Sequence, residues 1–325
     1  MDSQSHLTDA RRCLGAITSN VLARFAPALY VRLTRQTGRG AADVGAEANA
    51  GYFRHCFADY CTRLRRDPQS GAALAGLQVL EYGPGDVLGV ALLCIAHGAE
   101  RVVCVDRFPL ERLTPANIAI YRALLEGLAG EVRERAEAAF RTPGDPASGL
   151  DPARIDYRVT ADGASGMVAA FDLILSRAVL EHVHDLPLLF ADMRRALRPG
   201  GVAVHQVDLK SHGLDRSTPF DFLAWPSWLY ALMYSHKGFP NRWRVGHYRR
   251  WAQAAGLDIR ALEPNGTLSA GELARVRPRI RPELCAGTAE DELAWLGFWM
   301  EVTPAGGGRL HQSTRPVAGV GALQA

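Results

Sequence analysis

Hydrophobic and polar residues follow two different rhythms along the chain. Up to about residue 75, apolar residues recur three or four positions apart, which is the spacing of a helix with one buried face. This pattern covers 20–25 and about 47–66, and Thr37-Gly38-Arg39-Gly40 interrupts it between them. We therefore predict helices within residues 1–75 and interpret this region as a cap on the domain that follows.

From Leu77 onward, short apolar strands alternate with helices. The predicted strands cover 77–82, 101–106, 155–160, 171–176 and 202–208. The predicted helices cover 86–97, a segment that begins at Thr114-Pro115, and 186–197. Strands that alternate with helices form a parallel sheet covered on both faces. The pattern thus predicts a doubly wound α/β fold, in which ligands bind at the carboxyl ends of the strands.

Three stretches depart from this alternation. Residues 128–154 combine a charged helix with a Pro- and Gly-rich turn, which indicates a surface insertion. Residues 209–246 are rich in aromatic side chains and form a second insertion. Residues 304–325 are rich in Gly and Ala, and we predict a disordered tail there.

Composition narrows the class of protein. The chain has 325 residues, of which 48% are hydrophobic and 22% charged, and its net charge is +3. This charge is too small to indicate a nucleic-acid partner. No apolar run reaches the ~18 residues that cross a bilayer, the first residues lack a signal-peptide pattern, and no C-x-x-C pair occurs. We expect a globular cytoplasmic protein that binds neither nucleic acid nor a membrane.

The segment Glu81-Tyr82-Gly83-Pro84-Gly85 joins the first predicted strand to a helix. Glycines in such a turn let a ligand approach the backbone. A dinucleotide fingerprint would need its third glycine at position 88, where the chain has Leu88. The acids Glu81 and Asp86 also suit a pyrophosphate poorly. They favour a cationic ligand without phosphate, such as S-adenosylmethionine, with an NAD(P)-dependent oxidoreductase as the alternative.

The same segment resembles the first motif, E/D-x-G-x-G, of the class I S-adenosylmethionine-dependent methyltransferases, especially of members that act on small molecules. Residues 171–183, which end in Leu-Glu-His-Val, resemble that family's fourth-strand segment, and 197–201 resemble the turn before its fifth strand. The resemblance spans about 76–303, with a sixth strand at 257–262 and a seventh at 295–302. It implies a Rossmann-like seven-stranded sheet whose last strand is antiparallel.

The resemblance assigns cofactor-binding roles to residues at the first two strand ends. Glu81 would receive the methionine ammonium group, directly or through water, beside the turn made by Gly83 and Gly85. Asp106, which ends the second strand, would accept the ribose hydroxyls, and its distance along the chain from the glycine turn supports this role. Arg107 would flank the adenine.

Three further residues complete the cofactor-binding set that the resemblance implies. Asp162 would bond the adenine amino group, with Gly163 in the same turn. An ordinary Asx turn before Gly163 is the alternative for Asp162. Ser176 lies in the segment that matches the fourth strand. The predicted cofactor is therefore S-adenosylmethionine.

Methyl transfer to a hydroxyl requires alignment of the acceptor and removal of its proton. The catalytic candidates at the ends of the fourth and fifth strands are His182, His205 and Asp208. Strand alternation puts His205 and Asp208 on opposite faces, and Asp208 lies nearer the strand end. A core position for His205 and a structural role for His182 are the alternatives. His205, Asp208 and His212 also have a spacing that fits part of a metal site, but no further ligand joins them, so we predict no metal.

The expected reaction is methyl transfer from S-adenosylmethionine to a small-molecule acceptor. Resemblance to members with a similar insertion favours O-methylation of a sugar or glycan precursor, with a secondary metabolite as the next choice. We expect the insertion 210–246 to form the acceptor pocket or its lid, unless it only packs on the sheet. Four basic residues in it would face an anionic or polyhydroxylated acceptor, namely His236, Lys237, Arg242 and Arg244.

The predicted division of the chain is a helical cap over 1–75, a methyltransferase domain over 76–303 and a tail over 304–325. A non-catalytic partner protein that keeps this fold is a further alternative. The intact glycine turn and Asp106 argue against it, because a decayed site would lose its glycines first. The sequence does not indicate an oligomeric state.

Overall fold

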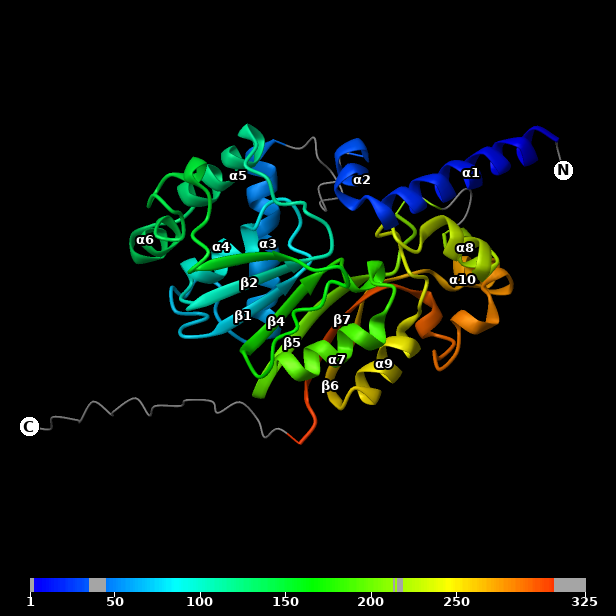
Figure 1. The fold of residues 1–325 in the computed structure, drawn as a ribbon. Coiled ribbons are helices and arrows are strands. Elements are labelled where there is room, and N and C mark those ends of the chain that lie inside the picture. Colours follow the sequence, from blue (N-terminus) through cyan, green and yellow to red (C-terminus); the bar gives the residue numbers. More distant parts are fainter. Residues whose placement is uncertain (1–2, 35–44, 213, 215–218, 307–325) are drawn as a thin grey trace, which may run out of the picture.

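The computed structural model describes residues 3–34, 45–212, 214 and 219–306. Its centre is a seven-stranded sheet with the order β3-β2-β1-β4-β5-β7-β6 (Figure 1). Neighbouring strands are parallel except for β7, which runs antiparallel to β5 and β6. The strands are β1 (Gln78–Tyr82), β2 (Arg101–Asp106), β3 (Ile155–Val159), β4 (Phe171–Arg177), β5 (Leu197–Asp208), β6 (Leu257–Thr267) and β7 (Trp295–Pro304). The predicted Rossmann-like doubly wound sheet with an antiparallel last strand is confirmed.

Helices cover both faces of this sheet. One face carries α3 (Ala46–Arg63), α4 (Gly89–Ala96), α5 (Pro115–Glu126) and α6 (Gly130–Glu137), and the other carries α7 (Leu186–Ala196) and α9 (Val245–Ala254). Successive strand residues point to opposite faces, so Val79 packs in the first apolar layer and Leu80 in the second. Among the described residues, no helix is long and apolar enough to cross a membrane.

Several element boundaries differ from those predicted. Helix α4 begins at Gly89 and not at residue 86, because the chain before it forms a turn. Strand β5 begins at Leu197, so Pro199-Gly200-Gly201 lies within its first part and does not precede it. Strand β6 extends to Thr267, because it pairs with β7 along this length. Thr37-Gly38-Arg39-Gly40 and residues 307–325 of the predicted tail lie outside the described residues.

Helix α3 belongs to the layer that covers the sheet. Its buried side chains include Phe53, Phe57 and Tyr60, which join the apolar core of that face. A Cβ atom added to Gly89 would lie 2.4 Å from the ring of Phe53, so the glycine at the start of α4 permits close packing against α3. The third glycine after β1 therefore serves helix packing in this fold.

Helix α1 (Ser3–Phe25) lies beside both α2 (Pro27–Thr34) and α8 (Ser227–Tyr234), on the side of the sheet where the parallel strands end (Figure 1). Polar contacts join α1 to the α8 segment: Asn20 Nδ2 donates to the carbonyl of Leu232 at 2.9 Å, and Lys237 Nζ donates to the carbonyl of Ala16 at 3.1 Å. The two N-terminal helices and α3 thus have different surroundings. The division of the chain at residue 75 stays a prediction.

The aromatic-rich insertion packs on the segment between β6 and β7. It contains a 3₁₀ turn, η3 (Asp221–Ala224), and α8, and the facing segment contains α10 (Ala270–Val276). Short 3₁₀ turns elsewhere are η1 (Pro146–Ser148), η2 (Leu180–His182), η4 (Arg277–Arg279), η5 (Pro282–Leu284) and η6 (Glu292–Ala294). The two segments share one apolar cluster, which includes Phe222, Tyr230, Leu268, Ile280 and Leu284. Most insertion aromatics in this cluster therefore serve packing.

Candidate active site

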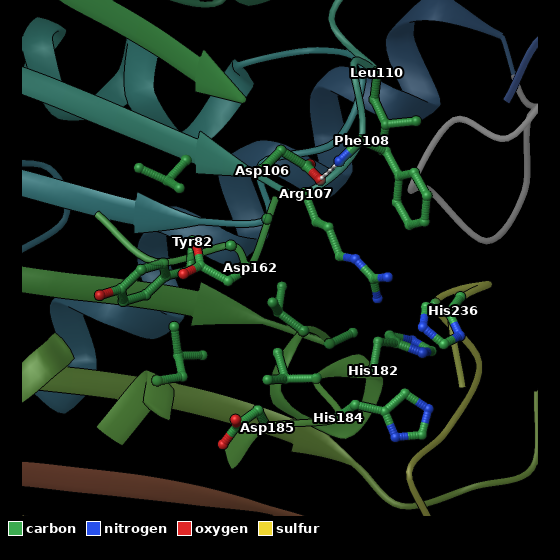
Figure 2. A pocket seen from close by; sticks show the side chains of 18 of the residues that line it. Tyr82, Asp106, Arg107, Phe108, Leu110, Asp162, His182, His184, Asp185 and His236 are labelled. Carbon is green, nitrogen blue, oxygen red and sulfur yellow. Dashed lines mark hydrogen bonds between the residues drawn. The ribbon is translucent and has the colours of Figure 1, made fainter. Parts of the chain in front are cut away.

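A cavity of about 840 Å³ opens where β1, β2, β4 and β5 end (Figure 2). Strand order reverses between β1 and β4, the place where doubly wound sheets bind ligands. Two sets of residues line it from opposite directions. We name the first set the β1–β2 wall, which consists of Gly83, Gly85, Asp106, Arg107, Asp162 and Gly163. We name the second set the β4–β5 wall, which consists of Val179, His182, Asp208 and His212.

The glycine turn of the β1–β2 wall accepts no side chain. Gly83 and Gly85 have φ values of +62° and +80°, which residues with a side chain rarely adopt. A Cβ atom on Gly83 would also lie 2.5 Å from Val179 Cγ2, across the cavity floor. Helix α5 holds the rest of the turn, because the Tyr121 hydroxyl accepts from the backbone N–H of Leu88 at 2.9 Å. Gly83 and Gly85 line the cavity, where a ligand can approach their backbone.

Asp106 presents a nearly buried carboxyl group to the cavity. It is 8% exposed, and its Oδ1 accepts from the backbone N–H of Phe108 at 3.0 Å. Burial raises the pKa of this carboxyl to about 6, although the backbone N–H groups of Phe108, Arg107 and Gly85 favour the charged form. Hydroxyl donors from a ligand would stabilise the charged form further. The group therefore suits a ligand that carries hydroxyls.

Asp162 and Arg107 complete the β1–β2 wall. Asp162 Oδ1 accepts from the backbone N–H of Ala164 at 3.1 Å, which is an Asx turn, and the residue also lines the cavity. The position of Asp162 is thus compatible with both predicted roles, binding the adenine and forming an Asx turn. The Arg107 side chain extends into the cavity toward His236 (Figure 2). Burial lowers the pKa of this guanidinium.

Glu81 lies behind the glycine turn and does not line the cavity. Its Oε2 accepts from Cys104 Sγ at 3.8 Å. Burial raises the pKa of this carboxyl to about 8, partly offset by the bonds from Cys104 and the backbone of Ala91. The group sits on the α3–α4 side of the sheet, beneath the turn. The structure therefore gives Glu81 no direct path to a ligand ammonium group.

Ser176 and His205 also lie away from the cavity lining. They are register partners on β4 and β5, and Ser176 Oγ lies 2.7 Å from His205 Nδ1. Both are fully buried, and burial lowers the pKa of His205 to about 3. They form a polar pair inside the sheet, below the site. Asp208, three residues further along β5, does line the cavity.

The β4–β5 wall brings together residues from two separate loops. His182 belongs to η2 after β4, and His212 follows β5. Their rings lie 4.8 Å apart in an edge-to-face arrangement. Between them, Glu181 Oε1 lies 3.9 Å from His182 Nε2 and 4.0 Å from His212 Nε2. Sequence reasoning missed Glu181, although the Leu-Glu-His-Val ending places it next to His182.

The basic residues of the insertion have mostly structural contacts. Among the four predicted to face an acceptor, His236 lines the cavity and the other three do not. Lys237 contacts α1, Arg242 Nη1 donates to the carbonyl of Trp225 at 2.7 Å, and Arg244 Nη1 donates to the carbonyl of Leu209 at 3.2 Å. The expectation that Lys237, Arg242 and Arg244 face an acceptor was wrong. These side chains instead pack against the aromatic rings of the insertion.

Comparison with known proteins decides the family. Residues 52–262, which make up more than half of the chain, match the model of a protein family whose description is "Methyltransferase domain". The chain belongs to this methyltransferase family. The methyltransferase is also 31% identical over 143 residues to a ubiquinone biosynthesis O-methyltransferase of Rhizobium johnstonii, a match that covers 44% of this chain and 45% of that protein. The chain thus spans about half the length of the curated relatives that it matches.

Two solved structures are similar to the methyltransferase. An S-adenosylmethionine-dependent methyltransferase from Mesorhizobium loti is 20% identical, with a TM-score of 0.39 and coverage of 70% of this chain and 91% of that chain. Phosphoethanolamine N-methyltransferase 2 of Haemonchus contortus, in complex with S-adenosyl-L-methionine, is 18% identical, with a TM-score of 0.39 and coverage of 76% and 52%.

Membership of a methyltransferase family agrees with the class I enzyme, dependent on S-adenosylmethionine, that the sequence leads us to expect. The residues present fit this cofactor. The glycine turn leaves backbone open at the end of β1, and the buried Asp106 carboxyl faces the cavity for the hydroxyls of a ribose. The oxidoreductase alternative is set aside, since the family is one of methyltransferases.

Proposed function

We propose that the enzyme transfers a methyl group from S-adenosylmethionine to an oxygen atom of a small-molecule acceptor. One observation carries this proposal: a single cavity joins the β1–β2 wall to the carboxylate and imidazoles of the β4–β5 wall. Its volume of about 840 Å³ is in the range of small-molecule sites. The name of the Rhizobium johnstonii relative, an O-methyltransferase, supports oxygen as the methylated atom.

We infer that the acceptor carries several hydroxyl groups, as a sugar, a glycan precursor or a polar secondary metabolite does. The acceptor side of the cavity supports this class, because several imidazoles and carboxyls line it: His182, His184, Asp185, Asp208, His212 and His236. Ser235, His236 and Gly238 close this side from the insertion. Residues 210–246 would therefore serve as the lid of the acceptor pocket, over a domain spanning 76–303.

Each wall would have its own task. When bound, S-adenosylmethionine supplies a methyl group activated by a sulfonium. Gly83 and Gly85 would leave room for it, Asp106 would accept its ribose hydroxyls, and Asp162 would bond the adenine. Arg107 would flank the adenine from the cavity side.

On the β4–β5 wall, Asp208 would accept the proton of the acceptor hydroxyl. Its Oδ2 pairs with Lys210 Nζ at 3.1 Å, and its Oδ1 accepts from the backbone N–H of Lys210 at 2.9 Å. These contacts orient the carboxylate at the end of β5. His182 would align the acceptor beside it. Glu81 would contact Cys104 and the backbone of Ala91 behind the turn, and not the ligand.

Two measurements test the proposal. Calorimetry of the full chain with S-adenosylhomocysteine should show one binding event, with no binding of NADH. Methyl-tritiated S-adenosylmethionine should then label a small metabolite in a cell extract, and mass analysis should find the label on oxygen. Failure to bind S-adenosylhomocysteine, or label found on nitrogen or only on macromolecules, would overturn it.

A further inference from the structure

Three side chains with metal-binding atoms converge on the β4–β5 wall. We name Glu181, His182 and His212 the Glu–His–His cluster. One ligand atom from each lies within 4.8 Å of those from the other two. The nearest approach is from Glu181 Oε1 to the two Nε2 atoms, at 3.9 Å for His182 and 4.0 Å for His212. At these distances the groups are too far apart to bond one another directly.

Glu181 is the unusual member of this cluster. It is 1% exposed, and neither of its carboxylate oxygens makes a hydrogen bond of normal geometry within the described chain. No lysine or arginine among the described residues forms an ion pair with it, since Lys210 pairs with Asp208 instead. Burying a carboxylate without a partner is costly. The backbone N–H groups of Glu181 and Asp208 and the charge of Lys210 favour the charged form of this carboxyl, but no side chain among the described residues forms a hydrogen bond with it.

We propose that the Glu–His–His cluster binds one divalent transition-metal ion, with Glu181 Oε1, His182 Nε2 and His212 Nε2 as ligands. Two imidazoles and one carboxylate are a common ligand set for zinc and its neighbours, whereas magnesium prefers oxygen ligands alone. Tetrahedral bonds of about 2.1 Å would hold these atoms about 3.4 Å apart. To reach this geometry the two Glu–His distances need to shorten by about half an ångström, and the distance between the two histidine ligand atoms, which is within 4.8 Å, by up to about 1.4 Å.

The position of the cluster gives the metal a role. Three protein ligands leave one coordination position open, as in catalytic zinc sites. His182, His212 and Asp208 all line the cavity, so an acceptor oxygen can reach that position. A bound metal lowers the pKa of a coordinated hydroxyl. Resting on the proposed function, we infer that the ion holds the acceptor hydroxyl and that Asp208 takes its proton.

This site differs from the possible metal site that the spacing of histidines and an aspartate in the sequence indicated. That pattern joined His205, Asp208 and His212, but His205 is fully buried beside Ser176 and lies outside the cavity lining. The register of β4 and β5 instead brings the loop with Glu181 and His182 against the loop with His212. The ligand set therefore comes from two segments, not from one.

The binding test uses the full chain, without cofactor or acceptor. The protein is stripped with a chelator, and cobalt(II) is added, because its visible absorption reports the ligand set. We expect one cobalt ion per chain by elemental analysis, with bands typical of low coordination number, and competition by zinc(II). The matched control is His184→Gln, a cavity histidine outside the cluster, which should bind cobalt like the wild type.

The variants are His212→Gln and Glu181→Gln, with circular dichroism as the check on folding. His212 is on an exposed loop, so its variant tests the site even if the buried Glu181→Gln fails to fold. We expect His212→Gln to lose at least about tenfold in cobalt affinity, the minimum loss on weakening a metal site. Absence of stoichiometric cobalt in the wild type, or unchanged affinity in His212→Gln, would overturn the proposal.

Activity separates this inference from the proposed function. If chelator-treated, metal-free enzyme still forms the O-methylated product at the full rate, the metal role is wrong and the proposed function stands. If cobalt binds as expected but the labelled product carries its methyl group on another atom, the metal site stands and the proposed O-methylation is wrong.

Discussion

The two walls of the cavity are built in different ways. The β1–β2 wall comes from the glycine turn after β1 and from the residues that follow β2 and β3, and Tyr121 of α5 bonds the backbone at Leu88, just beyond the turn. The β4–β5 wall comes from the loop after β4 and the segment after β5, whose His182 and His212 rings meet edge to face. The first wall suits a cofactor common to a family. The second can change with the acceptor while the sheet stays the same.

The largest expected effect is on the β4–β5 wall alone. Asp208→Asn keeps the size of the side chain but removes the proton acceptor. We expect turnover to fall about 10²- to 10⁴-fold, the usual contribution of a general base. Affinity for S-adenosylhomocysteine should stay unchanged, because Asp208 is on the other wall. Loss of cofactor affinity with normal turnover would show that the two walls are not separate.

A glycine substitution breaks the β1–β2 wall. Gly83→Ala forces a side chain into a left-handed conformation and toward Val179 Cγ2, 2.5 Å away. We expect a loss of ~2–4 kcal/mol in unfolding free energy from backbone strain and overpacking together. Urea unfolding measures this, and binding of S-adenosylhomocysteine should weaken in parallel.

Gly76 supplies the matched control for this substitution. It has a φ of +72°, and a Cβ atom there would meet nothing within 4 Å. Gly76→Ala should therefore show the strain alone, ~1–2 kcal/mol. Adding Val179→Ala to Gly83→Ala should recover part of the difference. Equal losses at the two glycines would contradict the close contact with Val179.

The pH dependence of cofactor binding tests Asp106. Its pKa of about 6 lies above the ordinary value of 3.8, so lowering the pH through about 6 protonates the group. Since the charged form accepts the ribose hydroxyls, affinity for S-adenosylhomocysteine should fall below pH 6, by up to about tenfold per pH unit. Asp106→Asn should bind ~1–3 kcal/mol more weakly and lack this pH dependence. Calorimetry at several pH values would detect an unchanged profile, which would remove Asp106 from the site.

Glu81 should affect stability more than binding. Its pKa is about 8 in the folded protein and about 4.5 when exposed, so the folded state keeps a proton that the unfolded state loses. Stability should therefore be complete below about pH 4.5 and decrease as the pH rises toward 8, by at most ~1.4 kcal/mol per pH unit. Glu81→Gln should flatten this slope in urea unfolding while cofactor affinity changes little. A steep loss of cofactor affinity would support the contact with the ammonium group, direct or through water, that the sequence predicts.

Local sequence patterns were sufficient to predict the residues of the site that lie at the strand ends. The capping of α5 by Thr114, the glycines at 83 and 85, and Asp106 at the end of β2 follow from short-range rules of backbone conformation and strand length. The positions of Asp208 and His205 relative to the cavity also follow the strand period of two. These features depend on residues within a few positions of one another.

Features that depend on residues far apart in the sequence could not be predicted from local patterns. Glu81 points beneath the turn because α3 and α4 form its surroundings. Lys237, Arg242 and Arg244 donate hydrogen bonds to backbone carbonyls of other segments, and no local sequence pattern specifies these contacts. The Glu–His–His cluster depends on the meeting of two loops.

The sequence by itself determined the doubly wound sheet, the glycine turn and the family, because periodicity and motifs act through local conformation. Only the tertiary structure decided which charged groups reach the cavity and which are buried in packing. The physical reason is that desolvation and ion pairing depend on every neighbour within a few ångströms, and most of those neighbours are far away along the chain.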